Sequence, residues 1–194
     1  MRNASSWVAT VMPILVPSST ASMLWALILP LESICTVMRE APVDEGAADP
    51  TFAPIVGERV AWLDTVAAYQ PGRFYTRELP AIQAVLAGAP PLRLLVVDGY
   101  CDLDPVGRPG LGRHVHQAIG VPVIGVAKTA FATARHAAEV RRGGAAKPLF
   151  VTACGLPLAE AAGIVAAMAG RYRLPDALRR VDALARGHAT PQPR

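Results

Sequence analysis

The chain of 194 residues is long enough for one domain with a buried core and too short for two full domains. Hydrophobic residues make up 52% of it but aromatic residues only 6%, so we expect a core built mainly from Ala, Val and Leu. The formal net charge of +4 weakly favours a polyanionic partner.

The numbers and spacing of cysteine and histidine indicate the cellular compartment and the kinds of metal site that the sequence can form. Cys35, Cys101 and Cys154 are widely spaced, odd in number and form no CxxC pair. This pattern argues against a disulfide framework and indicates a reducing, cytoplasmic compartment. The 4 histidines form no HExxH or comparable metal-ligand spacing.

The first 50 residues differ in composition from the rest. Residues 7–31 are apolar and long enough to span a membrane, but three prolines interrupt any continuous helix. Arg2 followed by an apolar stretch also resembles a signal peptide, without a clean cleavage site. We favour short buried strands at residues 8–16 and 24–29, or a poorly ordered extension, over a membrane segment.

After an acidic, loop-like stretch at residues 40–54, strand-like and helix-like segments alternate. We expect strands at residues 58–66, 92–97, 121–126 and 149–153, and helices at residues 80–87, 110–119, 157–168 and 175–185. Strands alternating with helices predict an α/β fold whose sheet is at least partly parallel.

The stretch LRLLVVDGY, residues 92–100, ends a buried strand on Asp98. Sites in α/β sheets gather beyond the carboxyl ends of the strands, and Gly99 lets another group approach the backbone. An Asp-Gly pair is also typical of a simple turn, which is the simpler interpretation of this stretch taken alone.

The segment AYQPGRFYTRELP, residues 68–80, interleaves aromatics with arginines, a pattern suited to bases and phosphates. Pro71 and Gly72 predict a tight turn that holds Tyr69 at a loop tip. Glu78 lies just before a proline expected in the first helical turn, where stabilisation of the helix dipole alone would explain a carboxylate.

Two later segments carry further candidates. Lys128 follows a buried strand in VPVIGVAKTAF, where it is suited to an ion pair or to a phosphate contact. Asp182 lies on the last helix, in RLPDALRRVDALAR, where an acid is usually solvated.

These segments, taken together, resemble endonuclease V, a nuclease family with a ribonuclease H-like fold. AYQPGRFYTRELPAI is similar to the family's Pro-Tyr-x-Pro-Gly and aromatic-x-Arg-Glu-x-Pro pattern, and VVDGY to its Asp-Gly-x-Gly segment. IGVAKT and YRLPDALRRVD are similar to two later signatures. The similarity spans about residues 68–186. It implies an α/β fold with a ribonuclease H-like mixed sheet flanked by helices.

The resemblance implies roles for the matching positions. Asp98 and Glu78 match carboxylates at the catalytic metal site, which takes Mg²⁺ or, in its place, Mn²⁺. Asp182 matches the acid on the last helix, and Lys128 the lysine that approaches the scissile phosphate. Tyr69 matches a wedge that fills the gap left by a displaced base. The residues expected to contact nucleic acid are Tyr69, Pro71, Gly72, Gly99 and Lys128.

The implied activity is Mg²⁺-dependent hydrolysis of a phosphodiester 3′ to a deaminated base, as DNA repair. Its partners would be DNA or RNA containing deaminated adenine, and the resemblance implies a monomer with no membrane association. The chain then divides into an atypical apolar segment (1–50), an endonuclease V-like domain (51–187) and a disordered tail (188–194).

Several positions depart from the family pattern. No Gly-Val-Asp-Val-like segment supplies the first-strand metal aspartate, and Glu32 is too poor a match for that role. Cys101 replaces a glycine, and Asp104-Pro105-Val106 replaces His-Pro-Arg. The N-terminal segment is a diverged pair of strands, an extension or an artefact of the gene start. A relative that binds nucleic acid without cutting it is the alternative function, followed by a membrane-associated protein.

Overall fold

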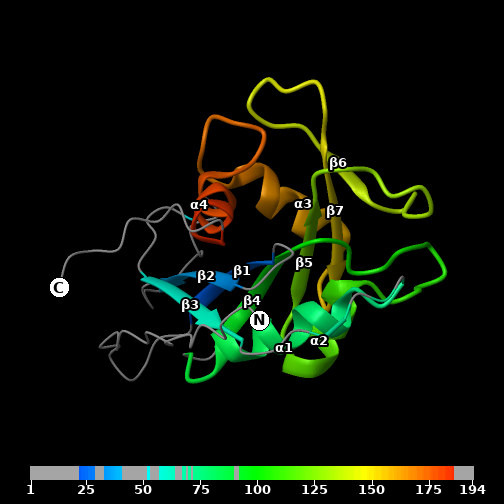
Figure 1. Ribbon diagram of the computed structural model, residues 1–194. Helices are drawn as coiled ribbons and strands as arrows, with labels where there is room; N and C mark the ends of the chain where they lie inside the picture. Colours follow the sequence, from blue (N-terminus) through cyan, green and yellow to red (C-terminus); the bar gives the residue numbers. More distant parts are fainter. Residues whose placement is uncertain are drawn as a thin grey trace, which may run out of the picture.

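The computed structural model describes residues 22–28, 33–40, 52, 57–63, 67, 68, 70, 72–89 and 92–185. Within these residues, the strands form one mixed sheet in the order β3-β2-β1-β4-β5-β7-β6 (Figure 1). The strands are β1 (Ser22–Ile28), β2 (Ser33–Glu40), β3 (Gly57–Trp62), β4 (Leu92–Asp98), β5 (Val123–Ala127), β6 (Ala138–Val140) and β7 (Leu149–Cys154). The helices are α1 (Tyr75–Leu86), α2 (Leu111–Ile119), α3 (Leu158–Ala167) and α4 (Asp176–Ala185).

The central strands β1, β4 and β5 run parallel to one another, and the outer strands are antiparallel to their neighbours. In β4, Leu94 and Val96 belong to one core cluster, whereas Leu95 and Val97 belong to another. Successive side chains of a strand point to opposite faces, so β4 is buried on both sides. This explains its uninterrupted aliphatic run.

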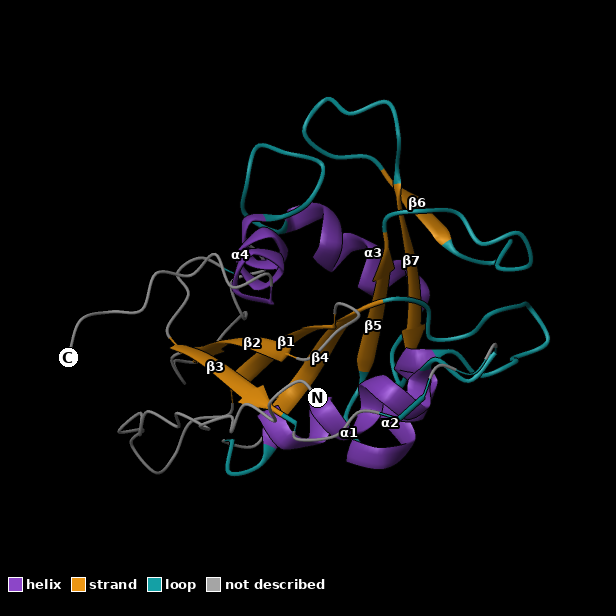
Figure 2. Ribbon diagram, in the orientation of Figure 1, coloured by secondary structure: helices purple, strands orange, loops and turns teal. Residues whose placement is uncertain are grey.

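Helices cover both faces of the sheet. Figure 2 shows α1 and α2 on one face and α3 and α4 on the other. Ile82 of α1 and Val115 of α2 belong to the same core cluster as Leu95 and Val97. Val165 of α3 and Val181 of α4 belong to the cluster of Leu94 and Val96. All four side chains are fully buried. β4 is packed between the two core clusters, and this packing fixes the position of its last residue at the edge of the sheet.

Most predicted elements are confirmed with shifted ends. The predicted strand at residues 24–29 is β1, and the helix at residues 157–168 is α3. The strands β2 and β6 were not predicted, and residues 8–16 lie outside the described part.

The start of the first helix was predicted wrongly. α1 begins at Tyr75, so Pro80 lies inside the helix and not in its first turn. A proline there removes one intrahelical hydrogen bond, but burial of Ile82 and Val85 on the same helix compensates by hydrophobic contact. As a result, Glu78 lies within the first helical turn.

Among the described helices, none is both long and apolar enough to cross a bilayer.

Candidate active site

Asp98 and Lys128 meet because two parallel strands end at the same edge of the sheet. Asp98 is the last residue of β4 and pairs in register with Val126 of β5. Lys128 follows β5 directly, and its Nζ lies 2.9 Å from Asp98 Oδ2. The strand-end position predicted for Asp98 is therefore confirmed, and its first partner is a cation.

The last helix brings a second carboxylate to the same lysine. Asp182 Oδ1 accepts a hydrogen bond from Lys128 Nζ at 3.3 Å. α4 is held in place by Leu178 and Val181, which are buried against the sheet. Only 17% of the Asp182 side chain is exposed, so it is not the solvated acid that its helix position alone suggests. One ammonium group thus links two carboxylates, one from β4 and one from α4, that are far apart in the sequence.

Glu78 is the most deeply buried of these acids. It lies in the first turn of α1 and is 4% exposed. Its Oε2 is buried, and the described residues offer this atom no hydrogen-bond partner. Burial raises the pKa of Glu78 to about 7, the charge of Asp98 adds to the rise, and the Arg77 guanidinium opposes it.

The same balance acts on Asp98. Burial raises the pKa of its carboxyl above the ordinary range, while the hydrogen bond and the charge of Lys128 lower it. The carboxylate of Asp182 raises it again. Glu78 and Asp98 therefore lie in a place where negative charge is costly and additional positive charge would stabilise it.

The donor set fits a hard divalent cation. Mg²⁺ takes oxygen ligands, keeps several waters and is usually held by one or two carboxylates together with substrate phosphates. Glu78 and Asp98 supply two carboxylates, one with an unpartnered buried oxygen. Within the described residues, no group of three or more Asp, Glu, His or Cys side chains is placed to hold a metal ion.

The strand beside β4 brings no acid to this edge. β1 has the sequence SMLWALI and lies parallel to β4, with Trp25 opposite Val96. Glu40 of β2 pairs with Ser22, which pairs with Leu92 at the other end of β4 from Asp98. The sequence motif lacks the family's first-strand aspartate, and the described strand beside β4 carries no acid either. Glu32, Asp44 and Asp49 lie outside the described residues.

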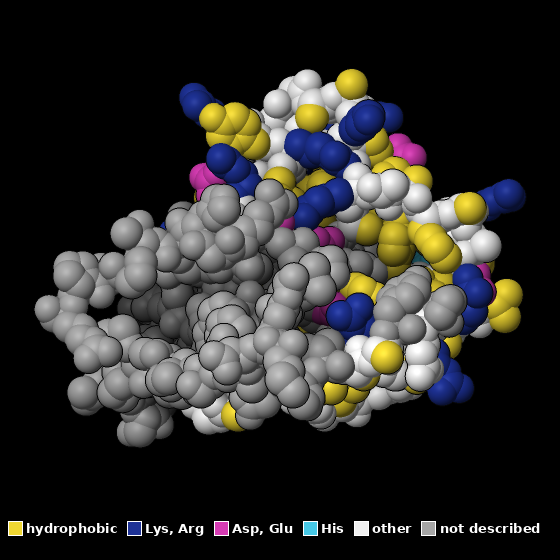
Figure 3. Space-filling view, viewed as in Figure 1, with side chains coloured by type: hydrophobic (Ala, Val, Ile, Leu, Met, Phe, Trp, Pro, Cys, Tyr) yellow, Lys and Arg dark blue, Asp and Glu magenta, His cyan; other side chains and the backbone are white. Residues whose placement is uncertain are grey.

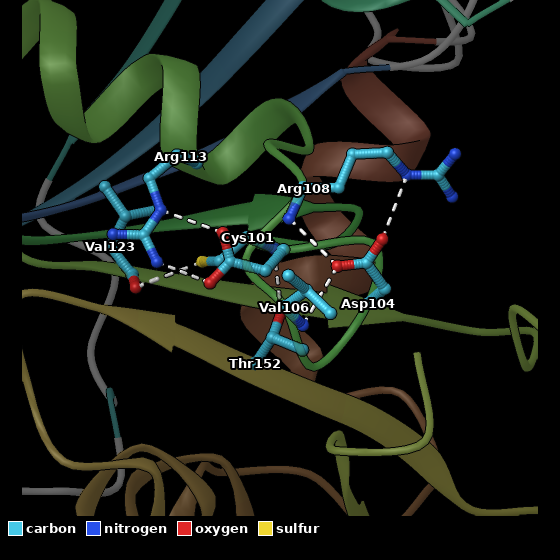
Figure 4. Close-up of polar contacts among 8 residues, drawn as sticks. Cys101, Asp104, Val106, Arg108, Arg113, Val123 and Thr152 are labelled. Atoms are coloured by element: carbon cyan, nitrogen blue, oxygen red, sulfur yellow. Dashed lines mark hydrogen bonds and ion pairs between the residues drawn. The ribbon is translucent and has the colours of Figure 1, made fainter. Parts of the chain in front are cut away.

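The loop after Asp98 is fixed to the sheet by contacts that no motif predicted. The Cys101 backbone N–H donates to the buried Thr152 hydroxyl at 2.8 Å, and Cys101 Sγ lies 3.4 Å from the Val123 carbonyl (Figure 4). Farther along, Arg113 Nε donates to Asp102 Oδ1 at 2.8 Å. These anchors hold the backbone that leaves Asp98.

Close backbone approach explains one glycine of this region. A Cβ at Gly125 of β5 would lie 2.6 Å from the Gly99 carbonyl oxygen and 2.7 Å from Thr152 Oγ1. Gly99 itself has φ +145°, a conformation that side chains rarely adopt. Both glycines therefore allow the loop to lie flat on β5.

The predicted wedge region is described only in part. Tyr69 and Pro71 lie outside the described residues. Gly72 has φ +76° and lies inside a turn that is closed by a hydrogen bond of 3.0 Å from the Arg73 N–H to the Gln70 carbonyl. The turn predicted around Gly72 is therefore confirmed.

Comparison with known proteins identifies the family. The family model for endonuclease V matches residues 48–155, which include Glu78, Asp98 and Lys128. The chain belongs to the endonuclease V family. It is similar to endonuclease V of Streptomyces avermitilis, with 32% identity over 159 residues that cover 71% of this chain and 69% of the relative.

Solved structures of endonuclease V share the fold. The Streptomyces avermitilis crystal structure has a TM-score of 0.62 and 25% identity, covering 89% of this chain and 83% of that chain. Endonuclease V of Ciona intestinalis, in complex with a 24mer DNA containing an inosine followed by a ribo-adenosine, has a TM-score of 0.63 and 16% identity. The match to the Ciona structure covers 88% of this chain and 86% of the Ciona chain. The sheet is therefore the ribonuclease H-like sheet of endonuclease V, and the chain belongs to a family of nucleases.

Proposed function

We propose that the protein is a divalent-cation-dependent endonuclease that hydrolyses a phosphodiester 3′ to deaminated adenine, in DNA or as inosine in RNA. One observation carries the proposal. In a chain of this family, the strand-end carboxylate Asp98 shares Lys128 with Asp182 and lies within electrostatic range of the buried Glu78.

Glu78 and Asp98 are the side chains that would hold the cation, with Mg²⁺ the expected ion. When bound, a divalent cation makes a water more acidic and neutralises charge on a phosphate. Lys128 places a positive charge at the same edge, where its ammonium group can donate to a phosphate oxygen. Asp182 keeps that ammonium group at the end of β5 through the 3.3 Å hydrogen bond.

Recognition of the base is assigned to the segments that flank these residues. Tyr69, with Pro71 and Gly72, is proposed to fill the gap in the stack when the target base is turned out. Gly99 follows Asp98 and has no side chain that would exclude the displaced nucleotide. The Ciona relative binds inosine-containing DNA, which supports hypoxanthine as the target base.

A relative that binds nucleic acid without cutting it is the second candidate. The absence of any carboxylate in β1 favours it, because the described residues then offer the cation two acids and not three. Both candidates require Lys128 as a phosphate contact, so the two differ in cleavage and not in binding.

Cleavage of a matched pair of oligonucleotides, identical except for inosine in place of adenosine, tests the proposal. We expect cutting of the inosine strand with Mg²⁺ and binding without cutting with Ca²⁺. Asp98→Asn should lower the rate by about 100-fold or more, because a metal site supplies several kcal/mol of transition-state stabilisation. Glu139→Gln, an exposed acid of β6, is the control and should cut normally. Tight binding with no cutting by the wild type would establish the second candidate instead.

A further inference from the structure

Two arginines lie over the ring of an exposed tyrosine at the start of α4. The Cζ atoms of Arg171 and Arg179 lie 4.8 and 4.3 Å from the centroid of the Tyr172 ring. Arg171 also donates a hydrogen bond to the Tyr172 hydroxyl at 2.6 Å. Tyr172 is 43% exposed, so its ring serves as a support for two guanidinium groups. We call these three residues the Arg-Tyr-Arg cluster.

The loop that carries Arg171 and Tyr172 is held in place by a buried arginine. Arg142 is only 8% exposed and donates to the carbonyls of Met168, Gly170 and Tyr172. A buried arginine that binds successive carbonyls keeps the loop from changing shape without losing several charge-assisted hydrogen bonds. The backbone that carries Arg171 and the Tyr172 ring is therefore fixed before a ligand binds.

The cluster adjoins the proposed catalytic residues. Arg173, the next residue after Tyr172, donates to the carbonyl of Lys128 and, at 2.7 Å, to that of Pro148. Arg179 precedes Asp182 on α4 by three positions, so the two lie on the same side of the helix. In Figure 3, Lys and Arg side chains gather on the upper part of the surface, where the loop before α4 and the loop between β6 and β7 lie in Figure 1.

The acid near the cluster does not neutralise it. Asp176 Oδ1 lies 3.5 Å from Arg179 Nη1, and about half of each side chain is exposed. An exposed pair of this kind contributes little, because water screens it. Phosphate groups bind arginine through short bidentate hydrogen bonds and can displace such a partner.

We propose that the Arg-Tyr-Arg cluster binds the phosphodiester backbone of the strand that flanks the scissile bond. This proposal rests on the proposed function, because it takes the strand cut beside Asp98 and Lys128 as the occupant. The Tyr172 ring holds the two guanidinium groups in place before binding, so little side-chain freedom is lost when a phosphate arrives. The cluster therefore adds affinity for long strands and does not read the base.

Fluorescence anisotropy with two inosine oligonucleotides tests the proposal. One ends a few nucleotides from the inosine, and the other extends about ten nucleotides farther on both sides, roughly 34 Å per side. Arg171→Ala and Arg179→Ala should each weaken binding of the extended strand by about tenfold and lower the salt slope by about 1. Binding of the short strand should stay unchanged, which also shows that the variants are folded.

Two further variants separate the role of the ring from that of the charge. Tyr172→Phe keeps the ring under both guanidinium groups and loses only the hydrogen bond from Arg171, so it should keep most of the affinity for the extended strand. Tyr172→Ala removes the ring and should lose affinity. Arg93→Ala removes an equal charge from an exposed site at the other end of β4, about 17 Å from Asp98, and should have no effect.

Equal losses for the short and extended strands, or a loss with Arg93→Ala as large as with Arg171→Ala, would overturn the proposal. The two proposals fail separately. If the wild type never cuts inosine strands but the cluster variants still lose affinity for the extended strand, the binding role of the Arg-Tyr-Arg cluster is supported and the nuclease assignment is contradicted.

Discussion

Replacing Glu78 by glutamine should make the protein more stable at alkaline pH. The folded protein holds Glu78 in a buried position that raises its pKa from an ordinary 4.5 to about 7, so ionisation is unfavourable there. Between these values the unfolded chain has lost the proton and the folded chain still holds it. The free energy of unfolding of the wild type therefore falls as the pH rises through this range. Glutamine has the same shape and stays neutral throughout.

The size of the effect follows from the shift. A difference of about 2.5 pH units at about 1.4 kcal/mol per unit gives about 3 kcal/mol. Near pH 4.5 the wild type and Glu78→Gln should be about equally stable, because the wild-type carboxyl is then protonated. Above about pH 8 the variant should be the more stable by about 3 kcal/mol.

Urea denaturation of both proteins across this pH range, in the presence of a chelator, measures the difference. Repeating the series with Mg²⁺ should restore stability to the wild type alone, by about 2.7 kcal/mol at a concentration one hundred times the dissociation constant. A difference between the two proteins that stays constant with pH would refute the raised pKa. Equal stabilisation of both by Mg²⁺ would refute the role of Glu78 as a ligand.

Three further substitutions test the packing and charge around the site. Lys128→Ala leaves Asp98 and Asp182 without their shared cation, so the free energy of unfolding should fall by about 1–3 kcal/mol at neutral pH and by less in acid. Urea denaturation at both pH values measures these losses, and equal losses would contradict the ion-pair assignment. Gly125→Ala should destabilise by about 1–3 kcal/mol, because the new Cβ meets the Gly99 carbonyl at 2.6 Å. Gly163→Ala in α3 meets nothing within 4 Å and should stabilise by about 0.5–1 kcal/mol; thermal denaturation that ranks these two glycine variants in the opposite order would show that backbone approach does not explain Gly125.

The elements that could be predicted are those whose signal is local. The aliphatic run of β4 was recognisable, because a strand buried on both faces has apolar residues at successive positions. The amphipathic pattern of α4 was also recognisable, because a helix buried on one face has apolar residues every three to four positions. β6 has only three residues, and β2 ends in Arg39 and Glu40, so neither shows a clear strand pattern. The start of α1 was misplaced because proline is usually found at the first helical turn, and here helix packing outweighed that preference.

The candidate residues of the site could be predicted from the sequence, but the contacts between them could not. The sequence by itself singled out the candidates Glu78, Asp98, Lys128 and Asp182, since each lies in a short motif of recognisable spacing. Only the tertiary structure decided that one ammonium group links carboxylates from β4 and α4, which are contributed by segments far apart in the chain. It likewise decided the burial of Glu78, and hence its pKa, and placed a strand without acids beside Asp98. Distances and burial depend on strand order and on how helices pack across the sheet, and no local pattern of residues encodes these.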